Sequence, residues 1–260
     1  IQTYLAESGM NIPVGFPVTL HNEGDFWATL TGDNAATIGA AIYADYDTGD
    51  VTAVAASTGA SVTAIMGSTN TGSLGSTFTA TGTGTSLAVT ALTGYLAVGD
   101  EISGTGVPAG TTIVAQVSGT TGAAGTYTTS AATTSAGDTV TSFGSTMKTT
   151  STTGLISVGE TVSGGAGFPV GATVVAQVSG TTGGAGVYTL SAAGSAYVAS
   201  ATGVTTFGNV LNVTAIGSGV LHVGDPVSGS GIPSGAVIAS QVSGTTGGVG
   251  VYTLDQSATA

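Results

Sequence analysis

The sequence predicts an all-β protein, with a small N-terminal β-barrel or sandwich domain followed by three tandem small β modules. Three observations predict this class. Short segments alternate large and small side chains, glycine-rich turns separate them, and no segment sustains the apolar spacing of a helix. The modules appear because one stretch occurs three times, as AQVSGTTGAAGTYT (115–128), AQVSGTTGGAGVYT (176–189) and SQVSGTTGGVGVYT (240–253).

Residues 1–57 are predicted to form the first β domain. Strands are expected at QTYLA, FPVTL, FWATL, TIGAAIYAD and VTAVAA, with turns at HNEGD, TGDN and DTGD. This segment holds the only Trp and a concentration of aromatic side chains. Residues 58–85, rich in Ser, Thr and Gly, are predicted to be a linker with one strand over 61–66.

The remaining chain divides into three β repeats, predicted over 86–134, 135–199 and 200–260, with a period of about 60 to 65 residues. In each repeat a strand such as GTTIVAQVS leads through the turn SGTTG into a return strand such as TYTT. The glycines of this turn adopt positive φ at little energetic cost. Strand alternation places Ile113 and Val117 on one face, and their counterparts Val174 and Val178, or Ile238 and Val242, on the same face. Each repeat is close to the lower size limit for independent folding, so the repeats are expected to bury surface against each other or another chain.

Charge composition excludes several classes of partner. The 260 residues include one basic side chain, Lys148, against 13 acidic ones, for a net charge of -12. Nucleic-acid binding and docking to an anionic membrane both require cations, so neither partner is expected. No apolar run approaches the roughly 18 to 20 residues that span a bilayer, and the absence of Cys excludes a disulfide framework or a thiolate metal site.

The acidic residues are interpreted as turn residues rather than as metal ligands. Asp45, Asp47 and Asp50 in DYDTGD have the alternate spacing of a Ca²⁺ loop but lack its downstream Glu, and TGD between strands is an ordinary hairpin turn. Each repeat also keeps one acid in VGD or VGE. It could be a weak cation site, but a lone acid favours acceptance of backbone N–H bonds. These three acids are Asp100, Glu160 and Asp225.

No catalytic, cofactor-binding or metal-binding residue is predicted. The two histidines, His21 and His222, have no evident partner for metal binding or acid–base work, and no GxSxG or GK[ST] motif is present. One tyrosine per repeat, Tyr127, Tyr188 or Tyr252, is assigned to the repeat core, with a sugar-binding aromatic ladder as the alternative. Gln116, Gln177 and Gln241 are expected to pair between strands or between stacked modules.

The N-terminal residues resemble a known family. IQTYLAESGM, NIPVGFPVTL and GDFWATL follow one another and continue into AAIYADYDTGDVTA, a series similar to bacteriophage structural cement, or capsid decoration, proteins. The resemblance covers residues 1 to about 56. It implies a virion protein that binds the major capsid protein on the outer surface of the shell, with residues 1–57 as the anchor. Tyr4, Phe16, Phe26 and Trp27 are then candidates for contact with the capsid or a sister subunit.

Two hypotheses for function follow. The first is a non-enzymatic capsid decoration protein whose β modules project outward as a short head fibre. The second is a module of a phage tail fibre, spike or bacterial adhesin that binds a receptor or a host-surface glycan through its SGTTG loops. Because the modules are thin, the chain is expected to associate with itself as a dimer or trimer.

Overall fold

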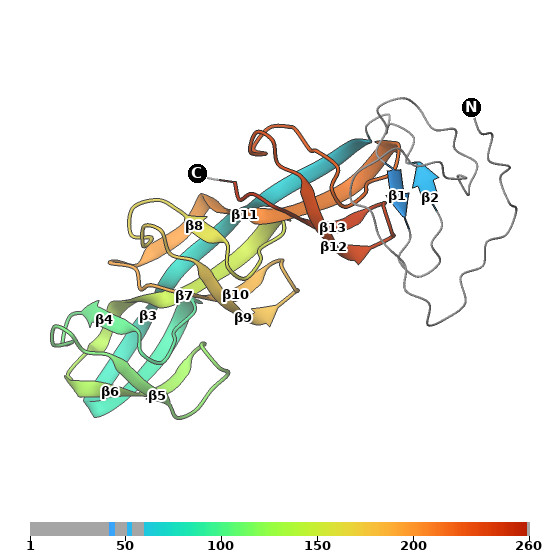
Figure 1. The fold of residues 1–260 in the computed structure, drawn as a ribbon. Helices are drawn as coiled ribbons and strands as arrows, with labels where there is room; N and C mark the ends of the chain where they lie inside the picture. Colours follow the sequence, from blue (N-terminus) through green and yellow to red (C-terminus); the bar gives the residue numbers. More distant parts are fainter. Residues whose placement is uncertain (1–41, 45–50, 54–59, 259–260) are drawn as a thin grey trace, which may run out of the picture. The chain divides into compact units, whose positions relative to one another are not determined.

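The computed structural model describes residues 42–44, 51–53 and 60–258. The chain forms two compact units, residues 1–58 and 59–260. Figure 1 labels the strands of each unit. The described residues form strands, turns and loops and contain no helix, so the all-β prediction is confirmed. None of them therefore forms a helix that is long and apolar enough to cross a membrane.

In the first unit, two strands are described. β1 (Ile42–Ala44) pairs antiparallel with β2 (Val51–Ala53), in register Tyr43 to Thr52. Both lie in segments predicted to be strands, TIGAAIYAD and VTAVAA. The other strands predicted for residues 1–57, and with them the choice between a barrel and a sandwich, lie outside the described residues.

Three long strands organise the second unit. They are β3 (Ser61–Gly94), β7 (Ala136–Gly154) and β11 (Val198–Ser218). Both β7 and β11 run antiparallel to β3 as its neighbours in the sheet. Because β3 is strand throughout, the linker expected over 58–85 is replaced by the central strand from residue 61 onward. Its many Thr residues suit a pleated strand, but its Ser and Gly residues are typical of a linker, so composition alone does not distinguish the two.

Short strands attach to the long ones. The sheet order is β12-β13-β11-β3-β7-β10-β9, with the other short strands pairing off this path. The short strands are β4 (Glu101–Gly104), β5 (Ile113–Gln116), β6 (Gly125–Thr133), β8 (Thr161–Ser163), β9 (Val174–Gly180), β10 (Gly186–Leu190), β12 (Ile238–Gly244) and β13 (Gly250–Leu254). The hairpins β5–β6, β9–β10 and β12–β13 contain the repeated stretch, and they follow one another along one side of the long strands (Figure 1).

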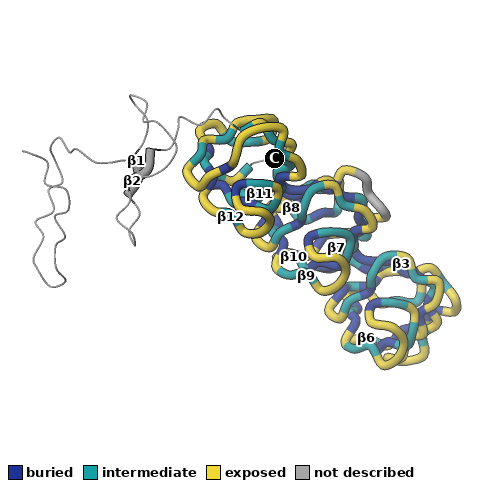
Figure 2. Tube along the Cα trace, turned by 90° about the vertical axis from the view of Figure 1, so that its right-hand side faces the viewer, coloured by how far each residue is buried: buried dark blue, intermediate teal, exposed yellow. Residues whose placement is uncertain are grey.

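The unit has three apolar cores in succession along β3. In Figure 2 the buried residues appear as dark blue stretches of the trace, and the loops around them are mostly exposed. The first core contains Phe78 of β3 and Tyr127, the second contains Leu74 of β3 and Tyr188, and the third contains Tyr252 with Met66 of β3 packed against it.

These cores share strands, so three self-contained tandem modules are not confirmed. Val140 of β7 completes the first core, and Val204 of β11 completes the second, although each lies in the sequence range assigned to the following repeat. Every core also uses residues of β3 that precede residue 86 and so lie outside all three repeats. The repeats therefore supply hairpins and turns to one continuous sheet.

Two glycines allow the long strands to approach closely. Gly67 and Gly75 have φ of +62° and +74°, and a Cβ on either would lie 2.0 Å from the carbonyl oxygen of Thr206 or Ser142. An L side chain fits neither the backbone conformation nor the space. Each of these glycines precedes a serine, Ser68 or Ser76, whose hydroxyl faces the neighbouring long strand.

Candidate functional site

The repeated acids close turns. The backbone N–H of the residue three positions earlier donates to each carboxylate: Ala97 to Asp100 at 2.9 Å, Ser157 to Glu160 at 2.9 Å, and His222 to Asp225 at 2.8 Å. The geometry is that of the turn interpretation. Within the described residues no group of three or more His, Cys, Asp or Glu side chains could hold a metal ion.

Two of these acids also join one repeat to the next. Asp100 accepts from Ser142 of β7 at 3.4 Å, and the Ser142 hydroxyl is 2.8 Å from that of Ser76 on β3. Glu160 accepts from Thr206 of β11 at 2.7 Å, and the Thr206 hydroxyl is 2.8 Å from that of Ser68 on β3. An acid from one repeat thus reaches β3 through a hydroxyl group contributed by the next.

Burial of these carboxylates is costly. Asp100 and Glu160 are each 2% exposed. Burial raises the pKa of Asp100 to about 6 against the opposing bonds from Ala97 and Ser142, and burial also raises the pKa of Glu160. Space for each carboxylate is left by a glycine on the next long strand, because a Cβ at Gly144 or Gly208 would collide with Asp100 or Glu160.

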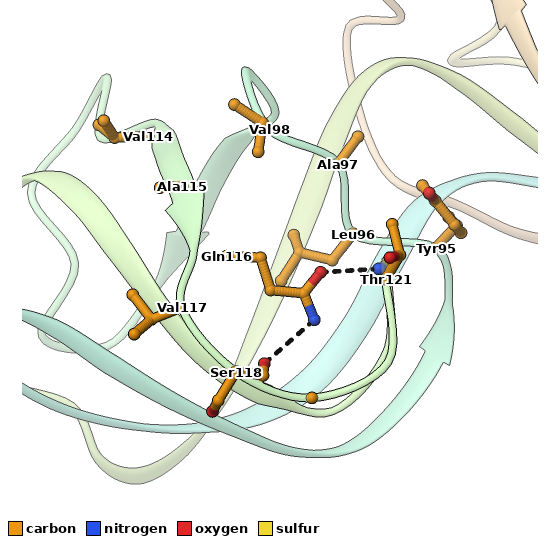
Figure 3. A pocket seen from close by; sticks show the side chains of 12 residues that line it. Tyr95, Leu96, Ala97, Val98, Val114, Ala115, Gln116, Val117, Ser118 and Thr121 are labelled. Carbon is orange, nitrogen blue, oxygen red and sulfur yellow. Dashed lines mark hydrogen bonds between the residues drawn. The ribbon is translucent and has the colours of Figure 1, made fainter.

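The glutamines stabilise their own loops. Gln116 donates to the carbonyl oxygens of Ser118 and Thr120 and accepts from the N–H of Gly122 at 2.9 Å. Gln177 and Gln241 make the same three bonds in their repeats. The expected pairing of these side chains between strands or modules is therefore wrong. The loop curls back over the glutamine and offers it backbone partners at close range, as Figure 3 shows for Gln116.

The repeat tyrosines lie in the cores, and their hydroxyl groups hydrogen-bond to the same loops that the glutamines bind. Tyr127, Tyr188 and Tyr252 are all buried. Their hydroxyls donate to the carbonyl oxygens of Ala123 at 2.6 Å, Gly184 at 2.6 Å and Gly248 at 2.7 Å. Burial raises the pKa of Tyr127 and Tyr188 to about 12. Buried rings of this kind present no face to a sugar.

A hollow of about 530 Å³ lies beside the first loop (Figure 3). Its wall includes Tyr95, Val98, Val114, Gln116 and Val117. The side chains of Val98, Val114 and Val117 stand exposed to solvent there. The hollow is therefore bordered by apolar groups and by the loop's own backbone, with no charged side chain among the residues that line it.

The exposure of Val117 differs from the strand pattern read from the sequence. Alternation places Val117 with the buried Ile113, yet Val117 is exposed, as are Val178 and Val242 in the other repeats. In the first repeat the register of β5 against β6 shifts between Ile113 and Ala115, and β5 ends at Gln116. A bulge followed by the end of a strand breaks the two-residue alternation on which the expectation depended.

Several predicted site residues fall outside the described part of the chain. These are the candidate contact residues Tyr4, Phe16, Phe26 and Trp27, the acids Asp45, Asp47 and Asp50, and His21. His222 is described, with Nδ1 3.5 Å from the Asp225 carboxylate and its side chain largely exposed. The only basic side chain in the sequence, Lys148, donates to the carbonyl oxygen of Gly94 at 3.0 Å.

The comparison with protein families gave a match over residues 1–89, to the model described as XM1 gp53 minor capsid protein. The matched range includes all of the first unit and continues through most of β3. No curated protein and no solved structure matched the chain. The N-terminal third of this chain is thus similar to a phage capsid-related protein family, in agreement with the resemblance carried by its sequence motifs.

Proposed function

We propose that this chain is a non-enzymatic structural protein of a bacteriophage virion, which binds the outer surface of the capsid and cements or decorates it. The observation that carries the proposal is the match of residues 1–89 to a minor capsid protein family. In this proposal residues 1–57 anchor the chain to the major capsid protein, and the sheet of the second unit projects outward from the shell.

Charge supports the exterior rather than the interior. A net charge of -12 is repelled by packaged DNA. Because the single lysine already binds a carbonyl oxygen within the chain, attachment would depend on apolar and uncharged hydrogen-bonding surface rather than on basic side chains. The aromatic residues of the first unit, Phe26 and Trp27 above all, are the proposed anchors.

Sedimentation with capsid shells tests this attachment. The full chain, mixed with shells assembled from the phage's major capsid protein, is expected to sediment with them at a saturating, reproducible ratio. The double variant Phe26→Ala, Trp27→Ala is expected to lose at least tenfold in affinity. A control variant, Val170→Ala, changes a fully exposed side chain of the second unit and should bind as the parent does. Absence of binding by the parent chain would refute the proposal.

Receptor binding is the alternative, and a glycan array distinguishes it. The repeat tyrosines are buried, which removes the aromatic ladder that a sugar would stack on. We therefore expect no saccharide to bind. Strong, specific binding that is lost when the SGTTG loops are altered would favour the receptor-binding function instead.

A further inference from the structure

Eight exposed valines form a repeated surface on the second unit. We call this surface the valine face; its members are Val98, Val114 and Val117 in the first repeat, Val158, Val175 and Val178 in the second, and Val223 and Val242 in the third. Each valine is at least half exposed, with Val117, Val178 and Val242 at 66%, 54% and 62%. None contributes to the three cores, which are complete without them.

The geometry of this face is the same in each repeat. The N–H of the glycine after the turn valine donates to a backbone carbonyl oxygen on the strand that precedes the loop. The three bonds run from Gly99 to Ile113, from Gly159 to Val174 and from Gly224 to Ile238, each at 2.8 Å. This bond brings the turn valine beside the exposed residue that follows the acceptor on the strand, which is Val114, Val175 or Ala239. The hairpins themselves follow one another along one side of β3, β7 and β11 (Figure 1). The chain therefore presents one small apolar surface three times in succession.

The strand and loop part of the valine face carries no charge. Its strand and loop segments read VAQVSGTTG, VAQVSGTTG and ASQVSGTTG, at 114–122, 175–183 and 239–247, and contain no charged residue. In the turn part, Asp100 and Glu160 are buried, and in the third repeat Val223 stands between His222 and Asp225, which pair with each other. Two copies of a chain with net charge -12 repel one another wherever their acids meet. An uncharged apolar surface is where they can approach at the lowest electrostatic cost.

We propose that the valine face is the surface through which copies of this chain associate with one another. A partner that covers all three repeats must present apolar groups at the same spacing. A second copy does so because it carries the same three repeats. The face begins at Val98, beyond the last residue of the capsid-related match at 89. Self-association through it is therefore separate from capsid attachment and is measured on the isolated chain.

The test is the mass of the full chain in solution, by analytical ultracentrifugation. The parent chain is expected to sediment at two or more times its monomer mass of 24.5 kDa. The triple variant Val117→Glu, Val178→Glu, Val242→Glu should sediment as a monomer, because it places three like charges in the contact. Salt should strengthen association of the parent by screening the repulsion between acidic copies.

The matched control places the same charges elsewhere in each repeat. Ala109, Val170 and Ser234 are equivalent, exposed positions in the proline-containing loops, and their triple substitution by Glu should leave the oligomer intact. A monomeric parent, an oligomeric valine-face variant, a monomeric control or dissociation by salt would each overturn the proposal.

Cross-linking gives a second readout, because the parent has no Cys. In the middle repeat, Val178→Cys is expected to form covalent dimers with a short bismaleimide, and Val170→Cys is not. The opposite pattern, or equal yields, would contradict contact through the valine face. If the capsid test fails while these results hold, the proposed function is wrong and the self-association stands.

Discussion

At the residue scale, the close approach of the long strands depends on glycines, because a Cβ at these positions would collide with the neighbouring backbone. Gly67 and Gly84 share a φ of +62° but differ in their surroundings: a Cβ on Gly67 would lie 2.0 Å from the Thr206 carbonyl oxygen, whereas a Cβ on Gly84 would meet nothing within 4 Å. The pair therefore separates the cost of the left-handed backbone from the cost of the collision.

Gly67→Ala is expected to destabilise the protein by about 3 kcal/mol, and Gly84→Ala by about 1 kcal/mol. Both variants strain the backbone, which costs about 1 kcal/mol, and only the first forces β11 away from β3, which costs about 2 kcal/mol more. Urea unfolding monitored by circular dichroism measures the difference. Equal losses in the two variants would show that β3 and β11 are not in close contact at Gly67.

The buried Asp100 predicts an unusual dependence of stability on pH. Its pKa is raised from 3.8 to about 6 on folding, so the folded state holds the proton more tightly than the unfolded state does. The free energy of unfolding is then highest below pH about 4 and falls as the pH rises through about 6. At about 1.4 kcal/mol for each pKa unit, the loss is about 3 kcal/mol. Glu160 acts in the same direction.

Asp100→Asn should remove most of this loss, because the amide oxygen still accepts from Ala97 and nothing ionises. The measurement is urea unfolding at pH 4 and pH 7. Asp225→Asn is the matched control, since it removes one charge from the same kind of turn at a side chain that is a quarter exposed. A parent chain that is more stable at pH 7 than at pH 4, with Asp100→Asn unchanged from it, would contradict the assignment.

At the element scale, the hairpins follow directly from the sequence, whereas the long strands do not. The three copies of the repeated stretch predict two strands and a glycine turn by alternation and turn chemistry, and the hairpins β5–β6, β9–β10 and β12–β13 contain those segments. The extent of β3 could not be recognised from composition, because its stability comes from pairing with β7 and β11, which are distant in sequence.

A pattern within β3 could have revealed its partners. Within β3, GST occurs twice, at 67–69 and 75–77, and SFG at 142–144 and TFG at 206–208 lie on the strands opposite. These motifs form the hydroxyl contacts Ser68–Thr206 and Ser76–Ser142, and Thr206 and Ser142 in turn donate to the buried acids. The exposure of Val117 could not be foreseen, because the register shift in β5 leaves no mark in the residue alternation.

Strand sharing predicts that one repeat does not fold alone. A peptide of residues 86–134 contains the first hairpin but lacks Phe78 and Ala80 of β3 and Val140 of β7, all buried in the first core. It is expected to be unfolded, with collapsed amide dispersion in its NMR spectrum. A longer piece, residues 59–260, retains every strand of the sheet and serves as the comparison. A dispersed, cooperative spectrum from 86–134 would restore the view of independent modules.

At the scale of the whole molecule, the chain combines an N-terminal third that is similar to a phage capsid-related family with a sheet of uncharged, glycine-rich hairpins. The buried acids and hydroxyls join successive repeats through β3, which favours a sheet that keeps its shape when only part of it is anchored. An exterior position on the particle suits both the net charge of -12 and a surface that can meet further copies of itself.

Cryo-electron microscopy of intact phage particles tests this account most directly. The account predicts density for the chain on the outer face of the capsid shell, with residues 1–57 against the major capsid protein and the sheet of residues 61–254 extending away from it. Particles that lack the chain, or that hold it only inside the shell or at the tail, would contradict it.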